Sequence, residues 1–495
     1  MIVRKNIITH AAGVALVSLF LLLQSGITNA RPTGQVGVDW GEKAGLGCVK
    51  CHMTETPGLY HQWNESQHGQ SGVNCLDCHQ AEKTDKDAFM HEDELISVIV
   101  SPKDCSKCHP TEFNEFHRSH HSNAAEILGS LDNLLGEVLG GPEAVTGGCK
   151  KCHGNKVEID EQGKPTLETW PNTGIGRINP DGSRGSCSAC HARHSFSRAQ
   201  ARTPDTCGKC HMGPDHPHIE VYNESKHGIM YRANIDKMNL ESDKWVVGVD
   251  YSVAPTCTTC HMGAAPYIAK THDVGERISW NLRTPISKKI NLIRLDNGYQ
   301  YDLPEGEPLP KVGEKPNDPK AKGGTVTEVM TWKDRRANME TVCHGCHVSS
   351  TVKGHYKQFD DLVNLYNNKF AKPIAAIVEE LKKDGHLTAA PFDEKLEWVW
   401  WEIWHHEGRR ARHGSAMSGP DYTWWHGMYE VVKHTYFSFI PELKKLVGKK
   451  EADRLLTKYF KPIEGHAWYF NGLGQEALDE VRQGYEERYG KGSFK

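Results

Sequence analysis

The chain has 495 residues, a net charge of −4 and a hydrophobic content of 38%, which is low for a globular protein of this length. The acidic balance argues against a nucleic-acid partner, because binding to phosphate backbones depends on clustered lysine and arginine. A basic redox partner suits such a surface better. The low hydrophobic content indicates that side chains alone do not build the whole core.

The first thirty residues have the pattern of an export signal. Arg4 and Lys5 precede an apolar run at 11–23, and small residues at 28–30 offer a cleavage site. The run is short for a membrane span, although a retained N-terminal anchor is the alternative. We therefore expect residues 1–30 to be removed and the mature chain to be a soluble, exported protein without a membrane span. Loss of Arg4 and Lys5 takes the net charge from −4 to −6.

All sixteen cysteines lie in eight copies of the pattern Cys-x-x-Cys-His. In this pattern two thiols bond covalently to one haem, and the following imidazole binds its iron. Zinc sites and disulfides are the alternative, but neither requires a histidine after every cysteine pair. The sequence therefore predicts eight c-type haems. The cysteines are Cys48, Cys51, Cys75, Cys78, Cys105, Cys108, Cys149, Cys152, Cys187, Cys190, Cys207, Cys210, Cys257, Cys260, Cys343 and Cys346. The motif histidines, predicted to be proximal ligands, are His52, His79, His109, His153, His191, His211, His261 and His347.

Between the motifs the chain is rich in Gly, Pro, Asn and Asp, which predicts short helices and loops instead of sheet. Residues 302–324 carry five prolines and are expected to form a surface loop. Beyond residue 355, apolar residues recur at helical spacing over 359–381 and tryptophans crowd 396–404. A third helix is expected to begin at Pro420, with Asp421 as a cap, and to stop before Pro441.

These patterns predict a mainly α multihaem cytochrome c with little sheet, a core packed with haem and a C-terminal bundle of long helices. The expected parts are a signal peptide at 1–30, an octahaem domain at 31–355 and a helical domain at 356–495. Because the porphyrins supply much of the apolar surface, we expect the chain without haem to be largely unfolded.

A six-coordinate electron-transfer haem needs a second axial ligand, and 29 histidines are far more than the eight of the motifs. Two others stand in nearly identical segments, Asn-Glu-Ser-Gln-His68-Gly and Asn-Glu-Ser-Lys-His227-Gly. The repeat favours a shared role as distal ligands, whereas surface histidines at similar helix ends are the alternative. The weaker distal candidates are His120 or His121, His272, His406, His413 and His426.

Three longer strings are more specific than the motif count: CSACHARHSF at 187–196, CGKCHMGPDH at 207–216 and GPDYTWWHG at 419–427. With the motif spacing and the tryptophan-rich tail, they resemble the octahaem hydroxylamine oxidoreductase family. That family includes the hydroxylamine- and hydrazine-oxidising enzymes of ammonia-oxidising and anammox bacteria. The resemblance extends over residues 40–440.

The resemblance implies that the fourth haem, on Cys149, Cys152 and His153, is five-coordinate and catalytic. It also implies that Asp215 and His216 are distal-pocket groups, and a carboxylate beside an imidazole is a suitable proton acceptor. The alternative is that His216 binds an iron and Asp215 caps a turn.

In oxidative members of the family, a tyrosine from a neighbouring subunit is cross-linked to the catalytic porphyrin, which is then called P460. Tyr422 is the candidate in this chain, with Tyr429 in reserve, and an aromatic core helix is the alternative explanation. A cross-link between subunits implies a ring, so the resemblance implies a covalent homotrimer.

The implied activity is the oxidation of hydroxylamine to nitric oxide or nitrite, with electrons leaving through seven bis-histidine haems to a cytochrome c partner. Hydrazine oxidation to dinitrogen is the close alternative. Reduction of nitrite or hydroxylamine to ammonia is a rival, and so is electron transfer without catalysis. The expected location is the periplasm or an equivalent extracytoplasmic lumen, which is the anammoxosome in an anammox bacterium.

Overall fold

The computed structural model describes residues 46–129 and 131–494, so the predicted signal peptide lies outside the described residues. Residues 44–495 form one compact unit. The structure has 52% helix and 9% strand, which confirms the expected mainly α fold with little sheet. Among the described residues, no helix is both long and apolar enough to cross a membrane.

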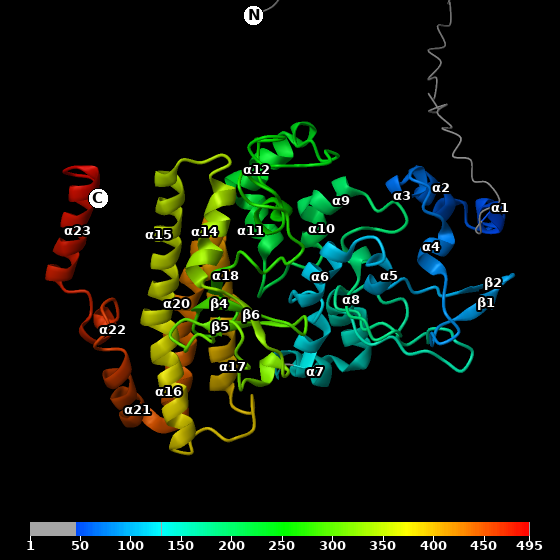
Figure 1. Cartoon of the computed structure of the whole chain (residues 1–495). Helices are drawn as coiled ribbons and strands as arrows, with labels where there is room; N and C mark the ends of the chain where they lie inside the picture. The colour runs from blue at the N-terminus through cyan, green and yellow to red at the C-terminus, as the bar shows by residue number, and fades with distance from the viewer. Residues whose placement is uncertain (1–45, 130, 495) are drawn as a thin grey trace, which may run out of the picture. The chain divides into compact units, whose positions relative to one another are not determined.

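The part of the chain that carries the first seven motifs is built from short helices joined by loops (Figure 1). Polar side chains start two of the motif helices. Asn74 accepts backbone N–H groups at the start of α4, and Thr256 does the same at α13. The first, second, fourth and seventh motifs each form about one helical turn, which gathers two thiols and an imidazole.

The elements of this part are α1 (Leu46–Glu55), α2 (Pro57–Glu65), α3 (Gln67–Gln70), α4 (Cys75–His79), β1 (Phe89–His91), β2 (Glu94–Ile96), α5 (Pro102–Cys105), α6 (Pro110–Arg118), η1 (Ala124–Gly129), α7 (Leu131–Gly147), α8 (Cys149–His153), η2 (Cys187–Ala189), α9 (Arg198–Arg202), α10 (Pro204–Gly208), α11 (His218–Glu224), α12 (Lys226–Ala233), η3 (Ile235–Lys237) and α13 (Cys257–His261).

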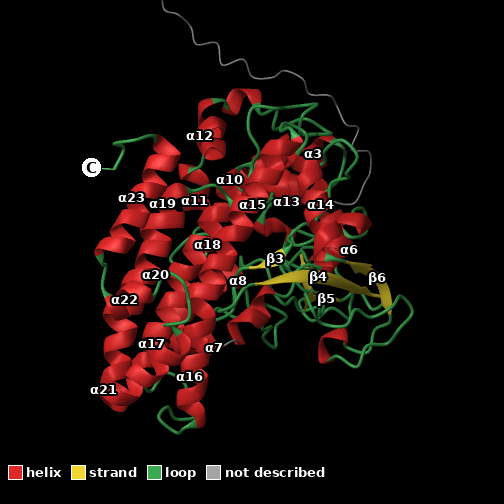
Figure 2. Ribbon diagram, turned by 90° about the vertical axis from the view of Figure 1, so that its left-hand side faces the viewer, coloured by secondary structure: helices red, strands yellow, loops and turns green. Residues whose placement is uncertain are grey.

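A small antiparallel sheet follows, and Figure 2 shows it among the helices. Its central strand is β4 (Lys288–Leu295), which pairs with β3 (Trp280–Asn281), β5 (Gln300–Pro304) and β6 (Val326–Met330), and η4 (Pro319–Ala321) precedes β6. The sequence analysis predicted a surface loop from residue 302. That prediction is wrong for Asp302, which lies in β5 and binds the buried Arg335 at 2.8 Å.

The C-terminal part consists of α14 (Trp332–Cys343) and three long helical runs, as the sequence predicted. The first run is α15 (Ser349–Leu365), η5 (Tyr366–Ala371) and α16 (Lys372–Lys383). The second is α17 (Lys395–Trp401), η6 (Glu402–Glu407) and α18 (Gly408–Ala416). The third is α19 (Pro420–Thr423), η7 (Trp424–Met428), α20 (Tyr429–His434), η8 (Thr435–Phe439) and α21 (Ile440–Tyr459), followed by α22 (Ala467–Asn471) and α23 (Gln475–Tyr489). The expected domain boundary at residue 355 falls inside α15 and stays a prediction.

The prediction that the third helix stops before Pro441 is wrong. The π-helical segment η8 leads directly into α21, so Pro441 stands at the second position of a new α-helical segment, where its missing N–H costs little. Asp421 is also not the cap, because Gly419 precedes the helix and the Asp421 carboxylate binds His426 instead.

Buried hydrophobic side chains concentrate in the C-terminal part. The largest cluster contains Tyr366, Ile374, Ile377, Phe439 and Leu443, each fully buried. Among the described residues, none of the four hydrophobic clusters contains a residue before Ile219. The described chain before Ile219, which carries the first six motifs, therefore contributes to none of these clusters, which supports the expectation that cofactor surface replaces a side-chain core there.

Candidate functional site

One continuous cavity of about 3710 Å³ runs through the motif-rich region. It is several times larger than an ordinary ligand pocket, which measures roughly 300–1,000 Å³. All sixteen cysteines of the eight motifs line it, and so do all eight motif histidines. The fold thus brings motifs spread over 300 residues of sequence to one shared interior space.

Backbone carbonyls orient several of the motif imidazoles. Nδ1 of His79 lies 2.8 Å from the Ser97 oxygen, and Nδ1 of His261 lies 3.2 Å from the Val274 oxygen. Donation from Nδ1 fixes the tautomer and leaves Nε2 free to bind a metal. This is the arrangement that a proximal haem ligand needs.

Five motif histidines face another histidine across the cavity. A metal ion between two imidazoles, each bound at about 2 Å, holds the ring centroids roughly 6 Å apart. The pairs and their centroid distances are His52–His91 at 6.1 Å, His79–His194 at 6.4 Å, His109–His68 at 6.1 Å, His211–His121 at 6.1 Å and His347–His227 at 6.0 Å. The geometry fits bis-histidine ligation at five of the eight motifs.

The repeated segments predicted to carry distal ligands have one local structure. In each, a serine (Ser66 or Ser225) caps a short helix by accepting the N–H of the glycine after the histidine. His68 and His227 consequently occupy the same position in their helices and face different motifs. Sequence reasoning missed His91 and His194, although His194 stands only three residues after a motif histidine.

The adjacent candidates His120 and His121 have different surroundings. Nε2 of His120 is 3.1 Å from Asp302, whereas His121 faces His211. The ring of His216 lies at a similar distance from His211, 6.2 Å, but both of its nitrogens have other partners. The geometry therefore favours His121 as the partner of the sixth motif.

The remaining three motif histidines have no ring contact with another histidine in the described ranges. Burial, followed by the charge of His272, lowers the pKa of His191 to about 4, so His272 is a neighbour of His191. His218 is a charged neighbour of His261, and the ring of the buried His413 lies 4.4 Å from that of His218.

His153 of the fourth motif differs from the others. Its Nδ1 lies 3.1 Å from the Ala124 oxygen, as in other motifs. Within the part of the chain that the structure describes, the ring contacts of His153 include no other histidine, and its backbone oxygen accepts the Gly176 N–H at 3.1 Å. The geometry is compatible with one open face at this motif.

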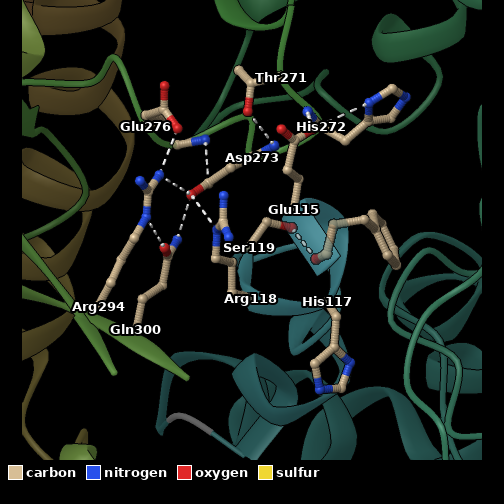
Figure 3. A network of polar contacts seen from close by, with 12 residues as sticks. Glu115, His117, Arg118, Ser119, Thr271, His272, Asp273, Glu276, Arg294 and Gln300 are labelled. Atoms are coloured by element: carbon tan, nitrogen blue, oxygen red, sulfur yellow. Dashed lines mark hydrogen bonds and ion pairs between the residues drawn. The ribbon is translucent and has the colours of Figure 1, made fainter. Parts of the chain in front are cut away.

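A buried polar network anchors the segment that carries His272 (Figure 3). The fully buried Asp273 lies 3.3 Å from Arg294 and accepts a hydrogen bond from Gln300 at 2.9 Å. Glu115 on α6 accepts the His272 backbone N–H at 2.8 Å. These contacts from α6, β4 and β5 hold the segment in place on the cavity wall.

Two predicted distal candidates lie away from the cavity. Nδ1 of His406 is 2.7 Å from Glu402, and Nδ1 of His426 is 2.9 Å from Asp421. Neither histidine lines the cavity of its own chain, so neither faces a motif there.

Thiols of different motifs are near enough to influence one another's pKa values, and this proximity gives the motifs a spatial order. The neighbouring pairs are Cys48–Cys75, Cys78–Cys105, Cys105–Cys187, Cys190–Cys207, Cys152–Cys210, Cys207–Cys257 and Cys260–Cys343. Counted from the N-terminus, the order is one, two, three, five, six, seven, eight. The fourth motif branches from the sixth.

Asp215 and His216 form a close pair on the cavity wall, beside the sixth motif and hence near the fourth. Nδ1 of His216 is 2.5 Å from Asp215, and its Nε2 is 3.0 Å from the Cys210 oxygen. Burial lowers the pKa of His216, but the Asp215 carboxylate outweighs it and the net pKa is raised. Burial raises the pKa of Asp215, yet His216, His405 and Arg409 hold it well below its usual range.

Arg409 and His405 were not predicted from the sequence. They come from the second C-terminal helical run, and both line the cavity. Arg409 lies 194 residues from Asp215 in the sequence, so no local sequence pattern predicts the contact between them.

Tyr422 and Tyr429 lie outside the cavity of their own chain. The Tyr422 ring stacks on His426 with centroids 5.4 Å apart, and its backbone N–H donates to Glu224 at 3.2 Å. Tyr429 is 45% exposed. Contact of either tyrosine with a haem of another subunit stays a prediction.

The residues present fit c-type haems. Each motif offers two thiols for covalent attachment and an imidazole, and the wall of the cavity offers further imidazoles at ligand distance. The fold and this site define a multihaem cytochrome c. A family model described as "Seven times multi-haem cytochrome CxxCH" matches residues 181–295.

More specifically, the chain is similar in sequence to a protein named for hydroxylamine oxidoreductase (HAO). It is 28% identical over 371 residues to a probable nitrite reductase-hydroxylamine oxidoreductase fusion protein of Kuenenia stuttgartiensis. The match covers 70% of this chain and 38% of that protein.

Two solved structures share the fold. A hypothetical multiheme protein superimposes with a TM-score of 0.65 and 24% identity, covering 82% of this chain and 96% of the other. A reducing HAO-like protein complex of Kuenenia stuttgartiensis gives a TM-score of 0.54 and 20% identity, with coverages of 83% and 85%.

The motif count predicts eight covalently bound haems on the mature chain, which is expected to begin near Arg31. Intact mass spectrometry of the denatured protein measures both features, because thioether bonds survive denaturation. A mass that corresponds to six or fewer haems, or one that retains residues 1–30, contradicts the corresponding prediction.

Replacing His68 or His227 by Ala is expected to convert one low-spin haem to high spin, because each faces one motif histidine at ligand distance. Electron paramagnetic resonance measures the change, and added cyanide should bind the vacated position. The exposed His386 provides the matched control, since its replacement by Ala removes an imidazole that lies outside the cavity. An unchanged low-spin signal in both ligand variants excludes them as ligands.

Proposed function

We propose that this protein is an HAO-like redox enzyme that oxidises hydroxylamine to nitric oxide or nitrite at its fourth haem site. The observation that carries the proposal is that, among residues 46–129 and 131–494, no histidine ring faces His153, while the Asp215–His216 pair lies beside the neighbouring sixth motif. Cys152 of the fourth motif contacts the Lys209 oxygen at 3.9 Å, which brings the two motifs together. The distant relationship to a fusion protein named for hydroxylamine oxidoreductase supports the same reading.

The chain's own residues have definable tasks in this reaction. Bound haem supplies one-electron redox chemistry and an open position for the substrate nitrogen. Asp215 is ionised and accepts a proton as N–H and O–H bonds of the substrate are lost. His216, with both ring nitrogens hydrogen-bonded to acceptors, is protonated and holds the carboxylate in position.

The order of the thiols offers two routes for the electrons. From the sixth motif one route passes through the fifth, third, second and first, and the other through the seventh and eighth. The acceptor would be a cytochrome c.

We also propose export to an extracytoplasmic compartment and a covalent homotrimer in which Tyr422 forms a P460-type cross-link. Hydrazine oxidation at the same site is the close alternative to hydroxylamine oxidation.

Reduction of nitrite or hydroxylamine to ammonia is the second candidate function. The observation that favours it is the positive charge of Arg409 and of the protonated His216 around Asp215, which suits an anionic substrate such as nitrite. The name of the Kuenenia relative also includes a nitrite reductase.

The absorption spectrum of the reduced protein tests these functions against one another. The proposed oxidase is expected to show ordinary c-haem bands together with one red-shifted species from the cross-linked haem. If that species is absent, reduction of nitrite or hydroxylamine to ammonia is the function that the spectrum favours. If no haem of the resting protein binds cyanide, all sites are six-coordinate and the protein is an electron carrier without catalysis.

A further inference from the structure

We propose that Arg409 is a positioning residue for the Asp215 carboxylate, so that the C-terminal helices complete the catalytic pocket instead of only packing against it. This inference rests on the proposed function, because it assigns Arg409 to the same site. Arg409 lies in none of the three sequence strings that carry the family resemblance.

Several contacts fix the Arg409 guanidinium. Its Nη1 donates to Asp215 Oδ2 at 3.2 Å, and its Nε donates to the backbone oxygen of Arg283 at 2.8 Å. The group also lies over the ring of Trp404, 5.1 Å from the centroid. Its side chain is only 11% exposed, so water screens its charge weakly at the carboxylate.

His405 accompanies Arg409 but does not replace its charge. Arg409 Nη1 lies 3.0 Å from His405 Nε2, and because a guanidinium can only donate, Nε2 of His405 must accept. Trp401 stacks on the His405 ring with centroids 4.3 Å apart and keeps it in place. Arg409 is thus the permanent positive charge that the C-terminal helix brings to Asp215.

The Asp215 carboxylate is consequently held on both sides. His216 binds Oδ1, whereas Arg409 binds Oδ2 and His405 lies 3.9 Å from the same oxygen. Loss of the positive charge at Arg409 leaves His216 as the main cationic partner, and the carboxylate then keeps its proton at higher pH.

Neighbouring contacts on the same loop fix the backbone only. Glu220 accepts the Gly213 N–H at 3.1 Å, and Arg410 donates to the Pro214 oxygen at 2.8 Å. Arg410 is therefore a matched control: it is the next residue on the helix, has the same charge and holds the same loop, but it does not bind the carboxylate.

Cyanide binding to the resting ferric holoprotein tests the inference without turnover. Hydrogen cyanide gives up a proton when it binds iron as cyanide, so the binding rate depends on a nearby base. In Arg409→Met the acid limb of the rate-versus-pH profile is expected to move to higher pH by about one unit. Arg409→Lys keeps the charge and should leave the limb in place, and Arg410→Met should also leave it unmoved.

The outcomes separate this inference from the proposed function. If the wild-type protein has no cyanide-binding haem, the proposed function fails. If the wild type binds cyanide and Arg409→Met has the same profile, or Arg410→Met shifts it equally, Arg409 has no positioning role. Arg409→Gln also lacks the charge and carries the same expectation, which keeps the test decisive if the methionine variant does not incorporate haem. In an Asp215→Asn background, removal of the Arg409 charge should produce no further shift of the limb.

Discussion

Replacing Asp215 by Asn is expected to lower hydroxylamine oxidation by a factor of roughly 10²–10⁴, the usual contribution of a general base. The amide keeps the shape of the side chain but cannot take a proton. In the structure the carboxylate is ionised and held by His216 and Arg409, so this substitution removes the acceptor while leaving the surrounding residues in place. Steady-state oxidation rates with hydroxylamine and with hydrazine measure the effect.

Asp205→Asn is the matched control for this variant. Asp205 is exposed on α10, two residues before the sixth motif. Its replacement by Asn makes the same chemical change without altering the Asp215–His216 pair. Haem content and the low-spin signal should be the same in both variants. Near-normal turnover of both substrates by Asp215→Asn would show that another group accepts the proton.

Replacing Tyr422 by Phe is expected to abolish the red-shifted ferrous band and to make the chains separable on denaturing gels. Phenylalanine has no oxygen through which to form the proposed cross-link, and distortion of the macrocycle is one means by which a protein tunes haem electronics. Oxidation should fall, whereas any reduction of nitrite or hydroxylamine should persist or rise.

Tyr429→Phe is the matched control, since both tyrosines lie outside the cavity of their own chain and about two turns apart on the same helical run. Survival of the band and of the cross-linked trimer in the Tyr422 variant would transfer the role to Tyr429. A wild-type protein with neither band nor cross-link favours the reductase.

The candidate site could be predicted only in part, because its ligands come from different kinds of sequence signal. A Cys-x-x-Cys-His motif is contained in five consecutive residues, so its chemistry can be read without a fold. A distal ligand, in contrast, need not stand at a fixed sequence distance from the motif whose haem it binds. His68 and His227 could be predicted as distal ligands because their sequence segment is repeated, whereas His91 comes from a β-strand and His194 from a loop.

The C-terminal helices could also be predicted from the sequence only in part. The apolar spacing over 359–381 predicts its helix because burial on one face repeats every turn. The course of the third run through Pro441 depends on the π-helical segment η8 before it, which no propensity scale indicates. Likewise Asp302 became a buried partner of Arg335 because β5 pairs with β4 in the small sheet.

The sequence by itself determined the Cys-x-x-Cys-His motifs, with the class of cofactor that they hold, and the mainly helical fold, because both depend on residues close together in the chain. The tertiary structure decided which histidines face which motifs, that His153 has no facing histidine in the described part of the chain, and that Arg409 meets Asp215. These contacts join segments up to 194 residues apart, and only the packing of the helices around one cavity brings them within bonding distance.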